Sequence, residues 1–276
     1  MPHMLIFGMG YTAGRLATRL RAEGWQVTGT RREAADARTI AFEDEGAVGA
    51  AIAAATHILS SVPPQGDADP VLIRYGAAIA AAPAFWTGYL SSTGVYGDAA
   101  GAWVDEGSAT GSGRRVARAA ADRAWGTLRP DMRLFRLPGI YGPGRSALDR
   151  VLADKAYRIV LPGQVFSRVH VDDIVAGVIA SFDGAPGPYN LADDLPCPQN
   201  TVVEAACALL GRACPPLLTL EEARLSPMAR AFYAENRRVA NGRARRLLGW
   251  TPRYPTYREG LAACLSLLVS NTDVVS

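Results

Sequence analysis

The chain has 276 residues, 49% of them hydrophobic and 20% charged, and a formal net charge of only +3. These values fit a globular protein with a sizeable core, built as one large domain or as a domain with a smaller companion. So small a net charge argues against nucleic-acid binding and against attachment to a membrane surface. The four cysteines and three histidines match no metal-ligand spacing, so no metal site is predicted. No apolar run reaches the roughly 18 residues of a membrane helix, and no charged leader precedes the first apolar run, so we expect a cytoplasmic protein.

The first half of the chain alternates short apolar runs with helical patterns. Strands are predicted at 4–7, 25–30, 56–62, 85–91 and 132–137, and helices at 13–23, 71–82 and 114–128. Such alternation implies right-handed β-α-β crossovers. The sequence therefore predicts an α/β fold, a Rossmann-type doubly wound parallel sheet with helices on both faces.

The pattern changes after Gly144. Helices are predicted at 148–152, 171–181 and 202–210, and prolines interrupt the segments between them. We expect residues 1–144 to form the sheet domain and residues 145–276 to form a smaller C-terminal lobe, partly interleaved with the sheet.

A glycine-rich loop follows the first predicted strand and opens the first predicted helix. Gly8-Met9-Gly10-Tyr11-Thr12-Ala13 matches the G-x-G-x-x-G/A phosphate loop in the structural context that this motif requires. Gly8 permits the tight turn, Gly10 lets the backbone approach a pyrophosphate, and Ala13 allows close packing of helix on strand. The helix N-terminus faces the anion. The loop, with Tyr11 and Thr12, predicts a dinucleotide site in residues 1–144, the alternative being a glycine-rich turn without a ligand.

The end of the second predicted strand bears on the choice of cofactor. NAD sites place an Asp or Glu there to bind the ribose hydroxyls, whereas this chain has Arg31 and Arg32. A guanidinium can bind a 2′-phosphate through paired, charge-assisted hydrogen bonds. The sequence therefore favours NADP over NAD, with a solvated basic turn as the alternative.

Several further motifs occur in an order that resembles one enzyme family. They are Ser91-Ser92-Thr93-Gly94-Val95-Tyr96-Gly97, Arg136-Leu137-Pro138-Gly139-Ile140-Tyr141-Gly142-Pro143-Gly144, Arg168-Val169-His170-Val171-Asp172-Asp173, Tyr189-Asn190-Leu191 and Leu248-Gly249-Trp250. Together they resemble the extended short-chain dehydrogenases/reductases, the NAD-dependent epimerase/dehydratase family that acts on nucleotide sugars. The resemblance implies hydride transfer with a nicotinamide cofactor, a small-molecule substrate in the C-terminal lobe, and homodimers as a common state.

Within this resemblance, further cofactor contacts are expected at the ends of the neighbouring strands and on the following helix. These residues are Ser61, Val62, Pro63, Ser91, Arg118, Pro138 and Gly139.

The family's acid/base pair is missing from this sequence. Members use a Tyr-x-x-x-Lys pair, but the only lysine is Lys155, and Val151 stands four residues before it. Alignment of the helix places Arg114 and Arg118 in the two positions, and arginine does not exchange protons near neutral pH. The catalytic candidates are therefore Ser92, Tyr96 and Tyr141, with Asp105 as a further acid.

Three interpretations remain open at this point. The first is an oxidoreductase or epimerase-like enzyme that acts on a nucleotide sugar or related polar metabolite with non-standard acid/base residues. The second is an NADP-binding sensor or regulatory protein that has lost catalysis. The third is a structural or assembly protein with a vestigial cofactor groove.

A late cluster of amides and guanidiniums is the candidate substrate site. Asn236 and Arg238 lie in a run of composition suited to a diphosphate or carboxylate, and Arg145 and Arg168 are expected to join it across a cleft. Surface charge and helix capping are an equally weighted alternative.

Overall fold

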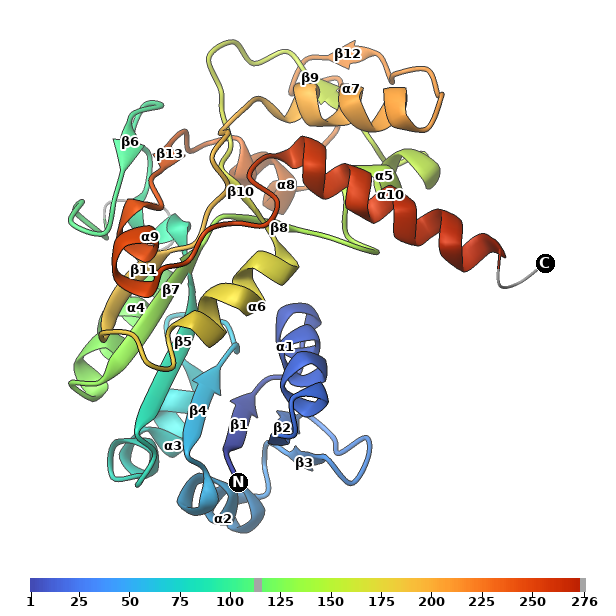
Figure 1. The fold of residues 1–276 in the computed structure, drawn as a ribbon. Coiled ribbons are helices and arrows are strands. Elements are labelled where there is room, and N and C mark those ends of the chain that lie inside the picture. Colours follow the sequence, from blue (N-terminus) through green and yellow to red (C-terminus); the bar gives the residue numbers. More distant parts are fainter. Residues whose placement is uncertain (112–115, 274–276) are drawn as a thin grey trace.

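The computed structural model describes residues 1–111 and 116–273. In this part of the chain the central sheet has seven strands in the order β11-β7-β5-β4-β1-β2-β3, and all its pairings are parallel (Figure 1). The strands are β1 (His3–Phe7), β2 (Gln26–Arg31), β3 (Thr39–Ala41), β4 (His57–Ser60), β5 (Trp86–Ser92), β7 (Met132–Leu137) and β11 (Gly187–Asn190). The predicted Rossmann-type parallel sheet is confirmed.

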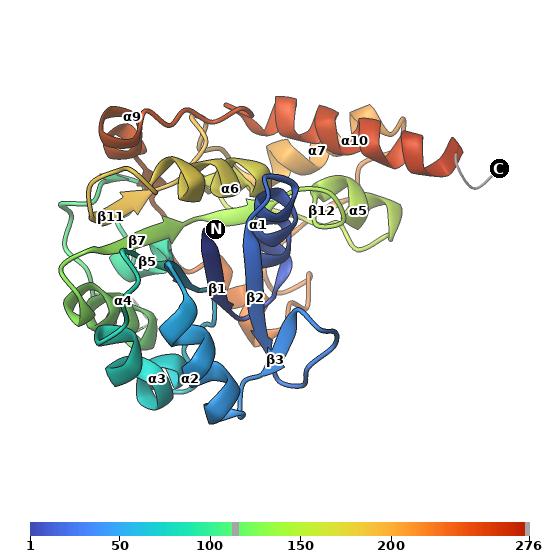
Figure 2. The same ribbon diagram turned by 60° about the horizontal axis from the view of Figure 1, so that its bottom comes forward.

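Helices cover both faces of this sheet, as Figure 2 shows. One face carries α1 (Tyr11–Ala22) and α6 (Val171–Ala180), and the other carries α2 (Glu45–Ala54), α3 (Pro70–Ala80) and α4 (Val116–Leu128). Leu16 of α1 and Ile174 of α6 are buried in the core of the first face, and Ile79 of α3 and Trp125 of α4 in that of the second. Burial on both faces explains why the strands are continuous apolar runs.

A third core lies in the C-terminal lobe, among α5 (Ala147–Leu152), α7 (Gln199–Leu209) and α10 (Tyr257–Asp273). Leu148, Val203 and Leu261 are buried there, one from each helix. In contrast, α6 and β11 come from the same half of the chain but belong to the sheet layers. None of the described helices combines the length and the apolar character needed to cross a membrane.

The remaining elements of the described chain are short. They are the parallel pairs β8 (Gly139–Tyr141) with β10 (Arg168–His170), β9 (Arg158–Ile159) with β12 (Leu217–Leu218) and β6 (Trp103–Val104) with β13 (Arg238–Val239), the 3₁₀ turn η1 (Thr93–Tyr96), and the helices α8 (Pro227–Phe232) and α9 (Gly242–Leu248).

The strand order reverses direction at β1, which pairs with β2 on one side and β4 on the other. Connections from β1 and β4 leave towards opposite faces, so a crevice opens outside the carboxyl ends of these strands. A ligand site is expected at this place.

Candidate functional site

A cavity of about 460 Å³ lies at the carboxyl ends of the central strands. It brings together many residues that the sequence analysis singled out. Those that line it are Gly10, Tyr11, Thr12, Ala13, Ser61, Pro63, Ser91, Ser92, Arg118, Pro138, Gly139 and Arg145. The cavity therefore joins the phosphate loop, the end of β5, helix α4 and the start of the lobe.

The phosphate loop is fixed to its neighbours at Gly8. This residue has a φ of +84°, and an added Cβ would lie 2.8 Å from Cγ2 of Val62. Its N–H donates to Oγ1 of Thr30 at 3.1 Å, and its carbonyl accepts from Oγ of Ser61 at 2.6 Å. Glycine is thus required here both by the backbone conformation and by the close approach of the next strand. Val62 packs beneath the loop and does not line the cavity.

The N-terminus of α1 has the form of an anion site. Its N-cap is Gly10, which offers no side-chain hydrogen bond, and the first turn contains no acidic residue. A Cβ at Gly10 would meet no atom of the described chain within 4 Å. The first N–H groups of a helix have no partner within the helix, and here Tyr11, Thr12 and Ala13 of the first turn line the cavity. These features fit the pyrophosphate of a dinucleotide.

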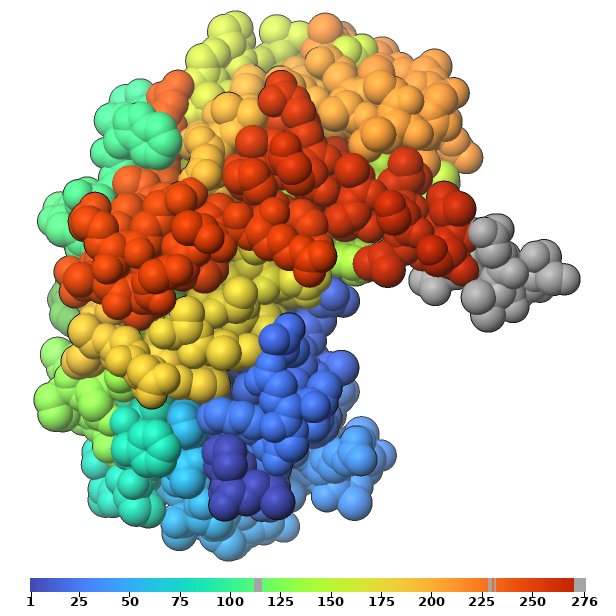
Figure 3. All heavy atoms as spheres, viewed as in Figure 1, coloured from blue at the N-terminus to red at the C-terminus, as the bar shows by residue number. Residues whose placement is uncertain are grey.

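The two arginines at the end of β2 lie outside this cavity. Arg31 lines a second, outer cleft together with Met9, Gly10 and Arg15, while Arg32 is exposed and lines neither space. The molecular surface is visibly hollowed between α1 and α10 (Figure 3). Gly10 borders both spaces, so the cleft that contains Arg31 adjoins the cavity at the phosphate loop.

At the other end of the cavity, β5 supplies two serines. The Ser92 hydroxyl accepts a hydrogen bond from the N–H of Gly94 at 3.1 Å, which leaves its own proton available to a ligand. The Ser91 hydroxyl donates at 2.6 Å to Asp122, whose carboxylate pairs with Arg136 at 2.8 Å. Ser92 is thus the serine placed to contact a ligand, and Ser91 is tied to the buried ion pair.

Two of the predicted catalytic residues need correction, because neither Tyr96 nor Tyr141 lines the cavity. The Tyr96 hydroxyl donates to Oδ1 of Asn190 at 2.7 Å and accepts from Arg136 at 3.1 Å. The Tyr141 ring packs against His170, and burial raises the pKa of its hydroxyl. Both hydroxyls are enclosed by the fold, so these residues support the structure.

The remaining acid/base candidates are also unsuited to proton transfer. Asp105 is exposed, does not line the cavity and accepts a hydrogen bond from Gly107 in a local turn. Arg114 lies outside the described residues. Among those described, Tyr11 is the tyrosine that lines the cavity, but its hydroxyl donates to the carbonyl of Pro143 at 3.0 Å. Burial raises the pKa of Tyr11 to about 12, which makes it a weak acid at neutral pH.

The predicted substrate cluster is only partly assembled. Arg145 lines the cavity, and its guanidinium lies 5.6 Å from the centre of the Tyr11 ring. Arg168 is buried instead and donates to the carbonyls of Phe166 and Cys197.

The segment around β13 presents different residues from those predicted. The Asn236 side chain donates to the carbonyl of Gly163, and Arg238 donates to that of Gly101, so both point away from the cavity. Glu235 and Arg237 line it instead. Side chains alternate along an extended segment, so the predicted residues and those that line the cavity lie on opposite faces of the same segment.

Comparison with known proteins gives the following matches. No family model matches this chain. Over 143 residues it is 36% identical to the "3-diazoavenalumate denitrifying reductase" of Streptomyces sp, a match that spans 46% of this chain and only 45% of that reductase.

Solved structures match over the whole chain. A functionally unknown conserved protein from Silicibacter pomeroyi is 39% identical, covers 96% of this chain and 99% of its own, and has a TM-score of 0.88. The human epimerase family protein SDR39U1, solved with NADPH, is 17% identical over 95% of this chain and 99% of its own, with a TM-score of 0.77. MoeE5, solved with UDP-glucose and NAD, is 20% identical, covers 98% of this chain and 99% of its own, and also has a TM-score of 0.77.

Proposed function

We propose that this chain is an NADPH-dependent reductase of a small polar molecule. The chain belongs to one family with the conserved Silicibacter pomeroyi protein. It has the fold of the extended short-chain dehydrogenases/reductases. The observation that carries the proposal is the cavity that joins the uncapped N-terminus of α1 to Ser92, Arg118 and Arg145. A dinucleotide needs the free helix N-terminus for its pyrophosphate, and a reacting substrate needs the polar side chains.

The proposal assigns a role to each group of residues. The first turn of α1 would bind the pyrophosphate, and Arg118, at the cavity, would lie towards the nicotinamide. Arg31 in the outer cleft, with its sequence neighbour Arg32, would bind the 2′-phosphate and favour NADP over NAD. A bound NADPH supplies a hydride to the substrate. Structures of the same fold with NADPH in SDR39U1 and with NAD in MoeE5 support a nicotinamide dinucleotide, without distinguishing the two.

The side chains at the reacting end favour reduction over epimerisation. Epimerisation of a sugar begins with removal of a hydroxyl proton, which requires a base with a pKa near neutrality. Tyr11 has a pKa of about 12 and already donates to Pro143. Ser92 can donate a hydrogen bond to an oxygen that gains negative charge, which suits an acceptor reactive enough to need little acid catalysis. The partial match to a Streptomyces reductase supports this direction.

An NADP-binding sensor is the second candidate, and one observation favours it. The hydroxyls of Tyr96 and Tyr141, which lie within the motifs that resemble the family, are enclosed in the fold. A protein with this site could bind the cofactor and report its level without turnover.

An absorbance assay of NADPH oxidation tests the reductase proposal. The panel contains UDP-glucose, UDP-galactose and small aldehydes, ketones and quinones. We expect no conversion of the nucleotide sugars, oxidation of NADPH by at least one of the other acceptors, and a loss of about 10²-fold in kcat for Ser92→Ala. Ser266→Ala, an exposed serine on α10, is the matched control. Tight NADPH binding with no oxidation by any acceptor favours the sensor, and rapid epimerisation of a nucleotide sugar contradicts both.

A further inference from the structure

The backbone around Glu235 is fixed on both sides. Gln164 donates from Nε2 to the carbonyl of Glu235 at 2.8 Å, and the N–H of Asn236 donates to Asp98 at 2.8 Å. Two residues beyond Arg237, the N–H of Val239 donates to Oγ of Ser167 at 2.9 Å. Contacts with two separate loops therefore fix the backbone so that Glu235, Arg237 and Val239 face the cavity.

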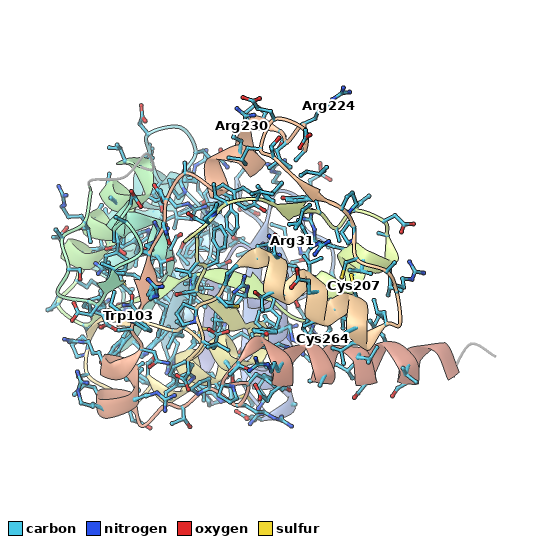
Figure 4. All side chains as sticks on the ribbon, turned by 90° about the horizontal axis from the view of Figure 1, so that it is seen from above. Arg31, Trp103, Cys207, Arg224, Arg230 and Cys264 are labelled. Atoms are coloured by element: carbon cyan, nitrogen blue, oxygen red, sulfur yellow. The ribbon has the colours of Figure 1, made fainter. Side chains whose placement is uncertain are left out.

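Glu235 and Arg237 form an ion pair in the cavity wall. Oε2 of Glu235 lies 2.8 Å from Nη1 of Arg237, and the two side chains are only 10% and 15% exposed. Arg237 also donates to the carbonyl of Gly97. Figure 4 shows that Arg224 and Arg230, from the preceding segment, lie at the outer edge of the molecule instead. The pair is thus a rigid part of the site.

One oxygen of this pair has no donor. Oε1 of Glu235 is buried, and no described residue forms a hydrogen bond with it. A buried carboxylate oxygen without a hydrogen bond is costly, because it has lost its water without gaining a partner. Glu235 lines the cavity, and a small rotation of its carboxylate would bring Oε1 within reach of a ligand that carries a donor group.

The surrounding wall indicates what else such a ligand contains. The rings of Phe166 and Phe232 line the same cavity and stack with centroids 4.4 Å apart at an angle of 5°. Arg145 lines it as well, and no acidic residue in the described part of the chain forms an ion pair with it. A flat apolar body suits the aromatic pair, and a carboxylate suits the guanidinium.

We propose that Glu235 determines substrate specificity by accepting, at Oε1, a hydrogen bond from a hydroxyl or ammonium group on a planar, anionic molecule. This inference rests on the proposed function, since it names the substrate class of the same cavity. It predicts a compact aromatic acid with a donor group, rather than a nucleotide sugar.

Calorimetric titration of the NADPH-loaded protein with three matched probes tests the proposal. The probes are 4-hydroxybenzoate, 4-(aminomethyl)benzoate and 4-methoxybenzoate, of which the last lacks a donor. We expect the hydroxyl or the ammonium probe to bind at least about tenfold more tightly than the methoxy probe, because hydrogen bonds to a charged acceptor are strong. Glu235→Ala removes that preference. Glu235→Gln keeps an acceptor for a hydroxyl but loses any preference for an ammonium group, which distinguishes the two donors.

Two controls separate the possible failures. Glu221→Ala removes an exposed carboxylate of the lobe and should leave the preference unchanged. Thermal unfolding of Glu235→Ala beside the unmodified protein measures whether the fold is intact. Equal affinity for the three probes, undetectable binding included, or a preference that survives Glu235→Ala overturns the inference. If the unmodified protein does not bind NADPH, the proposed function fails, and the same titrations without cofactor still test Glu235.

Discussion

The hydroxyl of Tyr96 is a structural group in a position where the family motif suggests chemistry. Tyr96→Phe leaves Oδ1 of Asn190 and one N–H of Arg136 without that partner. We expect it to lower the free energy of unfolding by about 1–3 kcal/mol and to leave NADPH affinity unchanged. Urea unfolding and NADPH titration measure the two quantities, with Tyr254→Phe as the control, since no described residue bonds the Tyr254 hydroxyl. Lost cofactor binding at full stability would instead assign Tyr96 to the site.

We propose that Arg31 and Arg32 carry the preference between the two nicotinamide cofactors. We expect NADP to bind at least tenfold more tightly than NAD, about 1.4 kcal/mol, and the double variant Arg31→Ala/Arg32→Ala to lose most of that difference. Arg38→Ala, which removes another exposed arginine after β2, should keep it. Calorimetry with both nucleotides checks this, and equal affinities in the unmodified protein contradict it.

Site residues differ in how far the sequence determines them. The phosphate loop could be predicted because its glycines are needed for local reasons: Gly8 has a positive φ, and Gly10 leaves the approach to the helix N-terminus open. The structure turns Glu235 and Arg237 to the cavity in place of the predicted Asn236 and Arg238, and an alternating pattern alone does not determine which set faces inwards. Contacts of Asn236 with Asp98 and Gly163, which are distant in sequence, select the set. Contacts between residues that are distant in sequence cannot be predicted from the local sequence pattern.

At the scale of elements, the N-cap of α3 connects two helices. Asp69 accepts from the N–H groups of Val71 and Leu72, and its second oxygen accepts from the indole of Trp125 on α4 at 2.8 Å. The side chain of Asp44, the exposed N-cap of α2, accepts only from the N–H of Ala47 among the described residues. Asp69→Ala should therefore cost about 2–4 kcal/mol, through the lost cap and the orphaned indole, against about 1 kcal/mol for Asp44→Ala. Thermal and urea unfolding of both variants measure the difference, and equal losses would show that the link to α4 contributes nothing.

The elements also show where periodicity is informative. Helix α2 was not predicted because its composition is alanine- and glycine-rich, with only Val48 and Ile52 buried, and gives no apolar stripe. Helix α10 was not predicted either, although Tyr257, Leu261 and Cys264 are buried on one face at helical spacing. That signal was present in the sequence. In contrast, α1, α6 and the five inner strands of the sheet were predicted within a few residues, because each is clearly buried, whereas the short edge strands β3 and β11 were not predicted.

At the scale of the whole molecule, buried ionisable groups make stability depend on pH. Burial, opposed by Arg168, raises the pKa of Asp193 to about 7. Because the folded value exceeds the unfolded value of about 3.9, the folded state holds this proton more tightly, and the resulting stability is lost as pH rises from about 4 to 7. His57 acts in the opposite sense, since burial lowers its pKa to about 4. Asp193→Asn should therefore become progressively more stable relative to the unmodified protein across that range. Urea unfolding at several pH values measures this, and a difference that is independent of pH contradicts it.

The central claim is that the chain binds NADPH in the cavity at the N-terminus of α1, and one calorimetric comparison tests it most directly. A side chain at Gly10 meets no protein atom at its Cβ and projects where the pyrophosphate must lie. Gly49, on helix α2, lines neither space and also has open space at its Cβ. We predict that the unmodified protein and Gly49→Val bind NADPH with similar affinity, while Gly10→Val stays folded and loses at least about a hundredfold. Normal binding by folded Gly10→Val, or no binding by the unmodified protein, would contradict the account.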